Sequence, residues 1–145
     1  MSVVFEVVAP RLLGPSLMVV AALIVKGYSD VGDGFSAGVI VGLAIALRYI
    51  TLGATRAEQS LPILRHAAPA AAGGLLLALA IGFFPILAGD PPFTHLPAPG
   101  ADVVQLGTLE LVTAIAFDLG LFVLVTGSLA VLVHELAHLV QVGPR

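Results

Sequence analysis

Two histidines four residues apart near the C-terminal end of the sequence have the spacing of metal ligands. They belong to the run His134-Glu135-Leu136-Ala137-His138, which has the spelling of the zinc-protease signature. On a helix, both imidazoles of such a pair can bind one Zn²⁺, and the glutamate between them can deprotonate the metal-bound water. The pattern therefore raises the hypothesis of a small zinc metalloprotease.

The rest of the sequence argues against a metal at this motif. A catalytic zinc usually takes a third protein ligand, and the seven residues after His138 include no suitable one. Asp118 lies sixteen residues before His134, which is about 24 Å along a helix. His66 belongs to a loop without a recognisable partner pattern. We interpret His134, Glu135 and His138 as a coincidental match at a helix end, and we expect no metal and no other cofactor.

The composition indicates an integral membrane protein. The 145 residues are 59% hydrophobic and only 10% charged, with a mean hydropathy of +1.09, whereas a soluble domain carries about 25% charged residues. We expect a single membrane domain over residues 1–145. Without cysteine there is no disulfide and no thiolate nucleophile. A net charge of −3 without a basic run argues against nucleic acid as a partner.

Four apolar segments are long enough to cross a bilayer, which needs about 20 residues of helix. They run over residues 10–28, 34–53, 67–89 and 107–140. The sequence therefore predicts an all-α fold, an integral membrane bundle of four transmembrane helices.

The positions of the basic residues predict the orientation of this bundle. The loop between the second and third spans contains Arg56 and Arg65, whereas the loop between the third and fourth has acids and no Lys or Arg. Because Lys and Arg accumulate in cytoplasmic loops, we expect the former loop and both termini to be cytoplasmic.

A row of glycines in the second span predicts a close helix contact. Gly34, Gly38 and Gly42 follow one another at four-residue intervals, and small residues at this spacing let two helices approach closely. The contact is either within the bundle or with a neighbouring protein of a complex.

Asp118 is an ionisable residue in the apolar body of the fourth span. Such a residue is costly in a membrane unless it faces protein or water and finds a partner. Lys26, at the outer end of the first span, is a candidate partner. The two residues form either a structural ion pair or part of an ion path.

The sequence of the fourth span resembles a known family. Residues 105–132, "QLGTLELVTAIAFDLGLFVLVTGSLAVL", are similar to the last span of the MnhB-like proteins, the B-type components of Mrp-type multisubunit Na⁺/H⁺ antiporters. "PPFTHL" at residues 91–96 resembles an outer-loop segment of that family, and "GYSDVGDGFSAGVIVGL" at residues 27–43 resembles its glycine-rich turn. The residues that match the family motifs include Thr108, Phe117, Gly120 and Phe35. Gly120 is also expected to serve helix packing.

The resemblance implies a subunit of a secondary ion transporter in a prokaryotic plasma membrane, and not an enzyme. Its implied partners are other antiporter subunits, the lipid bilayer, Na⁺ and H⁺. The implied role is in assembly of the complex, with a role in the ion path left open. Alternatives are a homologous subunit of a membrane-bound hydrogenase or related ion-pumping complex, a self-contained small transporter, and, remotely, the zinc metalloprotease.

Overall fold

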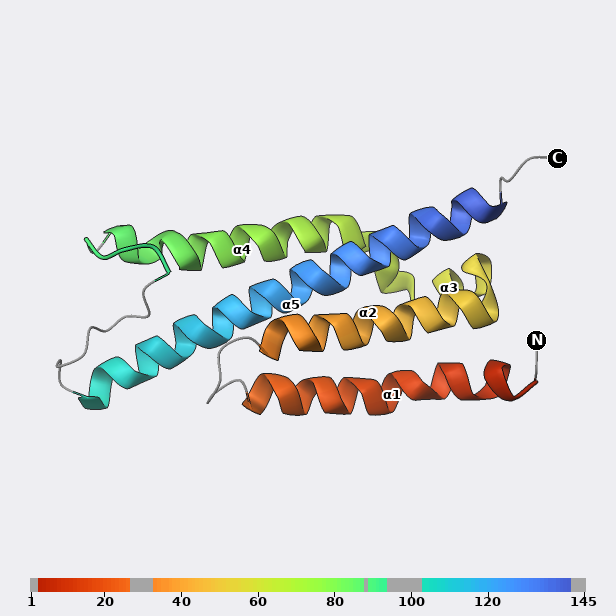
Figure 1. Ribbon diagram of the computed structural model, residues 1–145, viewed down its shortest axis with the longest axis horizontal. Helices are drawn as coiled ribbons and strands as arrows, with labels where there is room; N and C mark the ends of the chain where they lie inside the picture. The colour runs from red at the N-terminus through yellow and green to blue at the C-terminus, as the bar shows by residue number, and fades with distance from the viewer. Residues whose placement is uncertain (1–2, 27–32, 88, 94–102, 142–145) are drawn as a thin grey trace.

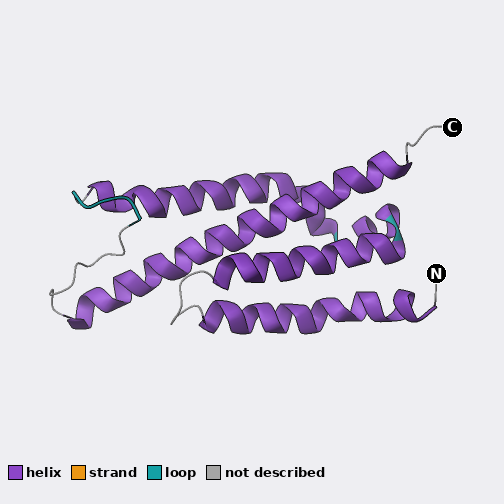
Figure 2. Cartoon of the chain, in the orientation of Figure 1, coloured by secondary structure: helices purple, strands orange, loops and turns teal. Residues whose placement is uncertain are grey.

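The computed structural model describes residues 3–26, 33–87, 89–93 and 103–141, and the secondary structure within them is helical (Figure 2). The helices in chain order are α1 (Val3–Lys26), α2 (Asp33–Leu52), α3 (Ala54–Ser60), the 3₁₀ helix η1 (Pro62–His66), α4 (Ala67–Leu87) and α5 (Val103–Gln141). The all-α prediction is confirmed.

Four of these segments are long and apolar enough to cross a membrane. They cover Val7–Ile24, Asp33–Leu52, Pro62–Leu87 and Thr113–Val140, with mean hydropathies of 1.9 to 2.2. Many large aliphatic and aromatic side chains on them are exposed on the outside of the bundle, where acyl chains would surround them. The prediction of a four-span membrane bundle is therefore confirmed.

The first helix begins earlier than its predicted span. α1 begins at Val3 and contains Pro10 and Pro15 in its interior, whereas the predicted span begins at residue 10. Proline is tolerated inside membrane helices because neighbouring groups can satisfy the backbone carbonyls that it frees.

Helix α5 runs diagonally between α2 and α4, and α1 packs on α2 (Figure 1). The N-terminal end of α1 and the C-terminal end of α5 lie at the same end of the bundle, together with α3. The buried core consists largely of small and β-branched residues. Its members are Val20, Ala37, Val41, Ile45, Tyr49, Ala54, Ala57 and Ala130.

The predicted glycine row of α2 faces α5. A Cβ atom added to Gly38 would lie 2.8 Å from the Cβ atom of Val125, and one added to Gly42 would overlap Leu129. Real Cβ atoms essentially never approach so closely, so the two helices pack at a distance that only glycine permits. The structure thus places this row in a contact within the bundle.

The opposite face of α5 packs on α4 in the same way. A Cβ atom added to Gly74 would lie 2.6 Å from the backbone oxygen of Gly120. One added to Gly127 would lie 2.8 Å from the backbone oxygen of Ala67. Glycines of α2 on one side, and of α4 and α5 on the other, thus let α5 approach both neighbours closely.

The connection between the second and third spans is helical, whereas the sequence pattern predicts a loop. Gly53 ends α2 with a φ of 76°, a left-handed conformation that favours glycine. The residues that follow, "ATRAEQS", are mostly good helix formers and make up α3. Their helical order fixes the side chains of this segment at the end of the bundle.

Candidate functional site

Asp118 lies in the middle of α5, where that helix meets α2. The residue is only 5% exposed, and a Cβ atom added to Gly34 would overlap its backbone carbonyl. Lys26 is the last residue of α1, but its side chain lies outside the described part of the structure. The proposed pairing of Asp118 with Lys26 therefore stays a prediction.

The family-motif residues lie in different surroundings. Phe117 stacks edge-on against Phe93, with ring centroids 6.2 Å apart, and Phe93 lies in the segment that resembles the outer loop of the family. The backbone N–H of Phe93 also donates to the carbonyl of Gly82 at 2.7 Å. Phe35 is 55% exposed on α2. Thr108 is in α5, and its side chain lies outside the described residues.

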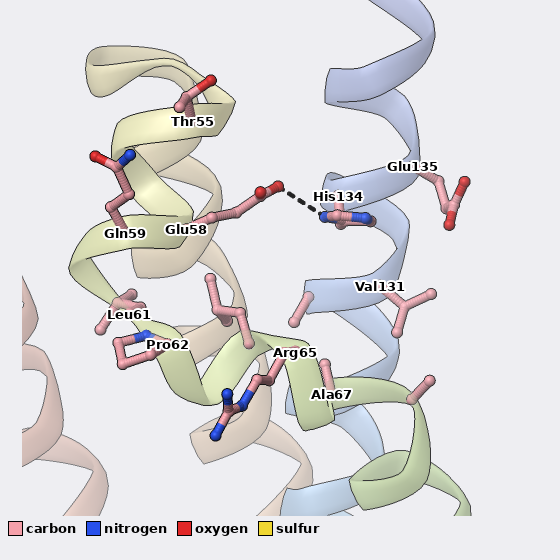
Figure 3. Close-up of a pocket in the computed structure, with 13 residues that line it drawn as sticks. Thr55, Glu58, Gln59, Leu61, Pro62, Arg65, Ala67, Val131, His134 and Glu135 are labelled. Carbon is pink, nitrogen blue, oxygen red and sulfur yellow. Dashed lines mark hydrogen bonds and ion pairs between the residues drawn. The ribbon is translucent and has the colours of Figure 1, made fainter.

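A polar cluster joins α3 to the last turns of α5. Glu58 Oε1 lies 2.8 Å from His134 Nδ1 and 3.0 Å from His138 Nε2. Figure 3 shows the Glu58 side chain extending from α3 towards His134. The side chains are 33% exposed for Glu58, 45% for His134 and 46% for His138. The cluster therefore lies at the rim of the bundle. We call Glu58, His134 and His138 the Glu58 cluster.

The Glu58 carboxylate has a third neighbour. The hydroxyl of Tyr49, a buried residue of α2, donates to Glu58 Oε1 at 3.4 Å. Burial raises the pKa of Glu58, but hydrogen bonds and charge from His138 and His134 outweigh it, so the pKa lies below its usual value. Glu58 is therefore held as a carboxylate at neutral pH.

A pocket of about 620 Å³ opens beside this cluster, between α3, η1, α4 and α5. Thr55, Gln59 and Arg65 contribute polar groups to its lining (Figure 3). Glu135 also borders the pocket, but its side chain points away from Glu58. The glutamate of the protease-like motif is thus not directed at the cluster.

The structure brings an acidic residue to the protease-like motif. No third metal ligand is evident from the sequence around the motif, yet Glu58 lies within hydrogen-bond distance of both histidines. Glu58 is the only acidic residue between the second and third spans. The basic residues predict that its segment is on the same side of the membrane as the C-terminal end. The sequence alone thus predicts that Glu58 and the two histidines share one side of the membrane. Their contact depends in addition on helix α3, which the sequence pattern does not predict.

A second polar contact at this end of the bundle is not evident from the sequence. The Arg48 guanidinium donates to Ser60 Oγ at 2.9 Å and to the carbonyl of Pro10 at 3.0 Å. One side chain of α2 thus links α1 to the end of α3. In the sequence, Arg48 is only a charge near the end of a span.

The fold and these sites define a polytopic helical membrane protein with a buried acid and a polar cluster at one end. Comparison with known sequences gives the family. Residues 4–131 match the family described as "Domain related to MnhB subunit of Na+/H+ antiporter". The chain belongs to this family, and the resemblance drawn from the fourth span is confirmed.

Three relatives illustrate the similarity. The chain is 34% identical over 128 residues to the A/B component of a probable K⁺/H⁺ antiporter of Rhizobium meliloti, covering 88% of this chain but only 12% of that protein. It is 30% identical to the B component of the Na⁺/H⁺ antiporter of Alkalihalophilus pseudofirmus, covering 80% of this chain and 78% of the relative. It is also 30% identical to the corresponding B component in Bacillus subtilis, covering 80% and 79%.

Proposed function

We propose that this protein is a membrane subunit of a multisubunit antiporter that exchanges a monovalent cation for protons. The observation that carries the proposal is the family match over residues 4–131, together with a bundle of four apolar helices of the length that a membrane requires. The names of the relatives refer to Na⁺/H⁺ and K⁺/H⁺ antiport, so the proposal covers both cations.

The arrangement of charges favours a supporting role in the complex. Within the described part of the spans, Asp118 is a buried acid, and one such group does not make a continuous proton relay. The chain contributes mainly to assembly of the complex, and Asp118 is its candidate for a contribution to the ion path.

Copurification from native membranes tests this function. A tagged copy of the chain should bring down a set of antiporter subunits, and deleting its gene should lower cation tolerance at alkaline pH. Recovery of hydrogenase subunits in place of antiporter subunits would contradict the proposal. So would full transport by this chain alone in vesicles.

The proposal includes an orientation with α3, η1 and both termini on the cytoplasmic side of a prokaryotic plasma membrane. Arg56 and Arg65 in this connection support it through the positive-inside rule. Because the chain has no cysteine, single cysteines report cleanly on sidedness. Gln59→Cys should be protected from a membrane-impermeant thiol reagent in intact cells, while Pro92→Cys should react. The reverse labelling pattern would invert the orientation.

A further inference from the structure

We propose that Glu58, His134 and His138 form a binding site for a divalent transition-metal ion, with Zn²⁺ as the best match. The site lies at the end of the bundle where α3 meets α5, far along α5 from Asp118. It goes beyond the antiporter function proposed above, because it requires no transport activity.

The positions of the ligand atoms support this site. One ligand atom from each of the three side chains lies within 4.8 Å of the other two. Tetrahedral zinc with bonds of about 2.0–2.1 Å places its ligands about 3.3 Å from one another. The distances of 2.8 and 3.0 Å from Glu58 to the two histidines therefore need to widen by only a few tenths of an ångström.

The chemistry of the ligand set also matches zinc. Two imidazole nitrogens and one carboxylate oxygen make up a known zinc-binding combination, and imidazole suits Zn²⁺ better than it suits Mg²⁺ or Ca²⁺. To bind a metal ion the carboxyl group must be deprotonated and both imidazoles must be neutral, so binding releases protons and weakens at low pH. The hydroxyl of Tyr49 donates to the same carboxylate, as outer partners of metal ligands commonly do.

The ligands lie on two helices, α3 and α5, that pack against each other. His134 and His138 lie one turn apart on α5, with ring centroids 4.5 Å apart. Glu58 is held opposite them by α3, whose residues Ala54 and Ala57 are buried in the core. An ion bound there would tie the α3 connection to the last turns of α5.

The geometry separates this site from a protease. In that enzyme class the glutamate after the first histidine acts on the metal-bound water, but here Glu135 points away from Glu58 (Figure 3). Glu58 takes the position of the third ligand instead. The site is accordingly one that holds an ion and links two helices, and Glu135 takes no part in it.

Metal titration of the full-length chain tests the proposal. The tag-free protein in lipid nanodiscs is titrated with Zn²⁺ against a chromophoric chelator, and Co²⁺ is used as a spectroscopic probe. We expect one ion per chain, a visible Co²⁺ spectrum of a four-coordinate site with water as the fourth ligand, and a higher Tm with Zn²⁺. Because there is no cysteine, thiolates cannot contribute to the binding.

Variants identify the ligands. Glu58→Gln, His134→Ala and His138→Ala should each lower Zn²⁺ affinity more than about tenfold, whereas loss of the outer partner in Tyr49→Phe should lower it about tenfold. Far-UV circular dichroism of each variant checks that the helices are retained. If a ligand variant loses helicity, the rise in Tm of the unaltered chain with Zn²⁺ shows whether the protein binds the ion.

Two controls make the test specific. His66→Ala removes an exposed histidine of η1, and Glu135→Gln removes the acid of the protease-like motif. Both should bind Zn²⁺ as tightly as the unaltered chain. The proposal is overturned if the unaltered chain binds no stoichiometric Zn²⁺, or if either control weakens binding as much as the ligand variants do. Either result leaves the antiporter assignment untouched, because copurification tests that assignment separately.

Discussion

Gly34 of α2 lies against the backbone carbonyl of Asp118 in α5, with no room between them for a side-chain carbon. The glycine row and the intramembrane acid, two separate features of the sequence, therefore meet at one helix contact. The close approach at Gly34 helps to bury Asp118, which is 5% exposed. A substitution in the glycine row would displace the turn that carries the acid.

Gly38→Leu should separate α2 from α5. A Cβ atom at this position would already lie 2.8 Å from the Cβ atom of Val125, and a leucine adds three more carbons. Overpacking of a tight core typically costs about 1–3 kcal/mol. We expect a lower Tm of the purified chain and less assembled complex in the membrane. Gly73→Leu, in α4 where nothing lies within 4 Å of an added Cβ, is the control. An unchanged Tm for Gly38→Leu would remove the close-contact argument.

Asp118→Asn should impair the complex, because it replaces the ionisable carboxyl group of a buried residue with an amide of the same shape. If the carboxylate is structural, the amount of assembled complex falls. If it belongs to the ion path, assembly is normal and cation/proton exchange in membrane vesicles is lost. Glu135→Gln, on the same helix but exposed, should change neither measurement. Normal assembly together with normal exchange for Asp118→Asn would show that neither role is correct.

The sequence predicted the spans well and the polar cluster poorly, for a physical reason. A membrane helix needs a long apolar run, which is a local property that composition reveals directly. The contact of Glu58 with His134 depends on the direction in which the chain leaves α2 at Gly53. It also depends on the short helix α3, which has no long apolar run by which it could be predicted. A contact between Lys26 and Asp118 is hard to predict for the same reason, because no local sequence pattern shows how α1 lies relative to α5.

Phe93→Ala should loosen the contact of the C-terminal end of α4 with α5. The Phe93 ring lies 5.7 Å from that of Phe83 and 6.2 Å from that of Phe117, and it covers Gly82. Aromatic pairs contribute about 0.5–1.5 kcal/mol each beyond their buried area. We therefore expect a loss of about 1–2 kcal/mol in the free energy of unfolding, measured by denaturant titration in detergent. Phe93→Tyr retains the ring and should behave like the unaltered chain, and equal losses for both variants would argue against the ring contacts.

Arg48→Met should detach α1 from the end of α3 while leaving α2 intact. The guanidinium donates to Ser60 Oγ and to the carbonyl of Pro10, and methionine keeps much of the apolar stem without any donor. A hydrogen bond from a charged group contributes about 1.5–3 kcal/mol when buried, but the contact to Ser60 is exposed. We accordingly expect a loss of about 1 kcal/mol in the free energy of unfolding. Limited proteolysis should show faster cleavage in the α3–η1 connection of this variant.

Two further variants separate the geometry of the Arg48 contacts from its charge. Arg48→Lys keeps the charge but lacks the planar guanidinium that reaches both acceptors. It should therefore lose most of the same free energy of unfolding as Arg48→Met. Arg56→Met, on the exposed face of α3, removes an equal charge nearby and should leave cleavage unchanged. If Arg48→Lys were fully stable and only Arg48→Met were cleaved, charge and not the two-acceptor geometry would hold the three helices together.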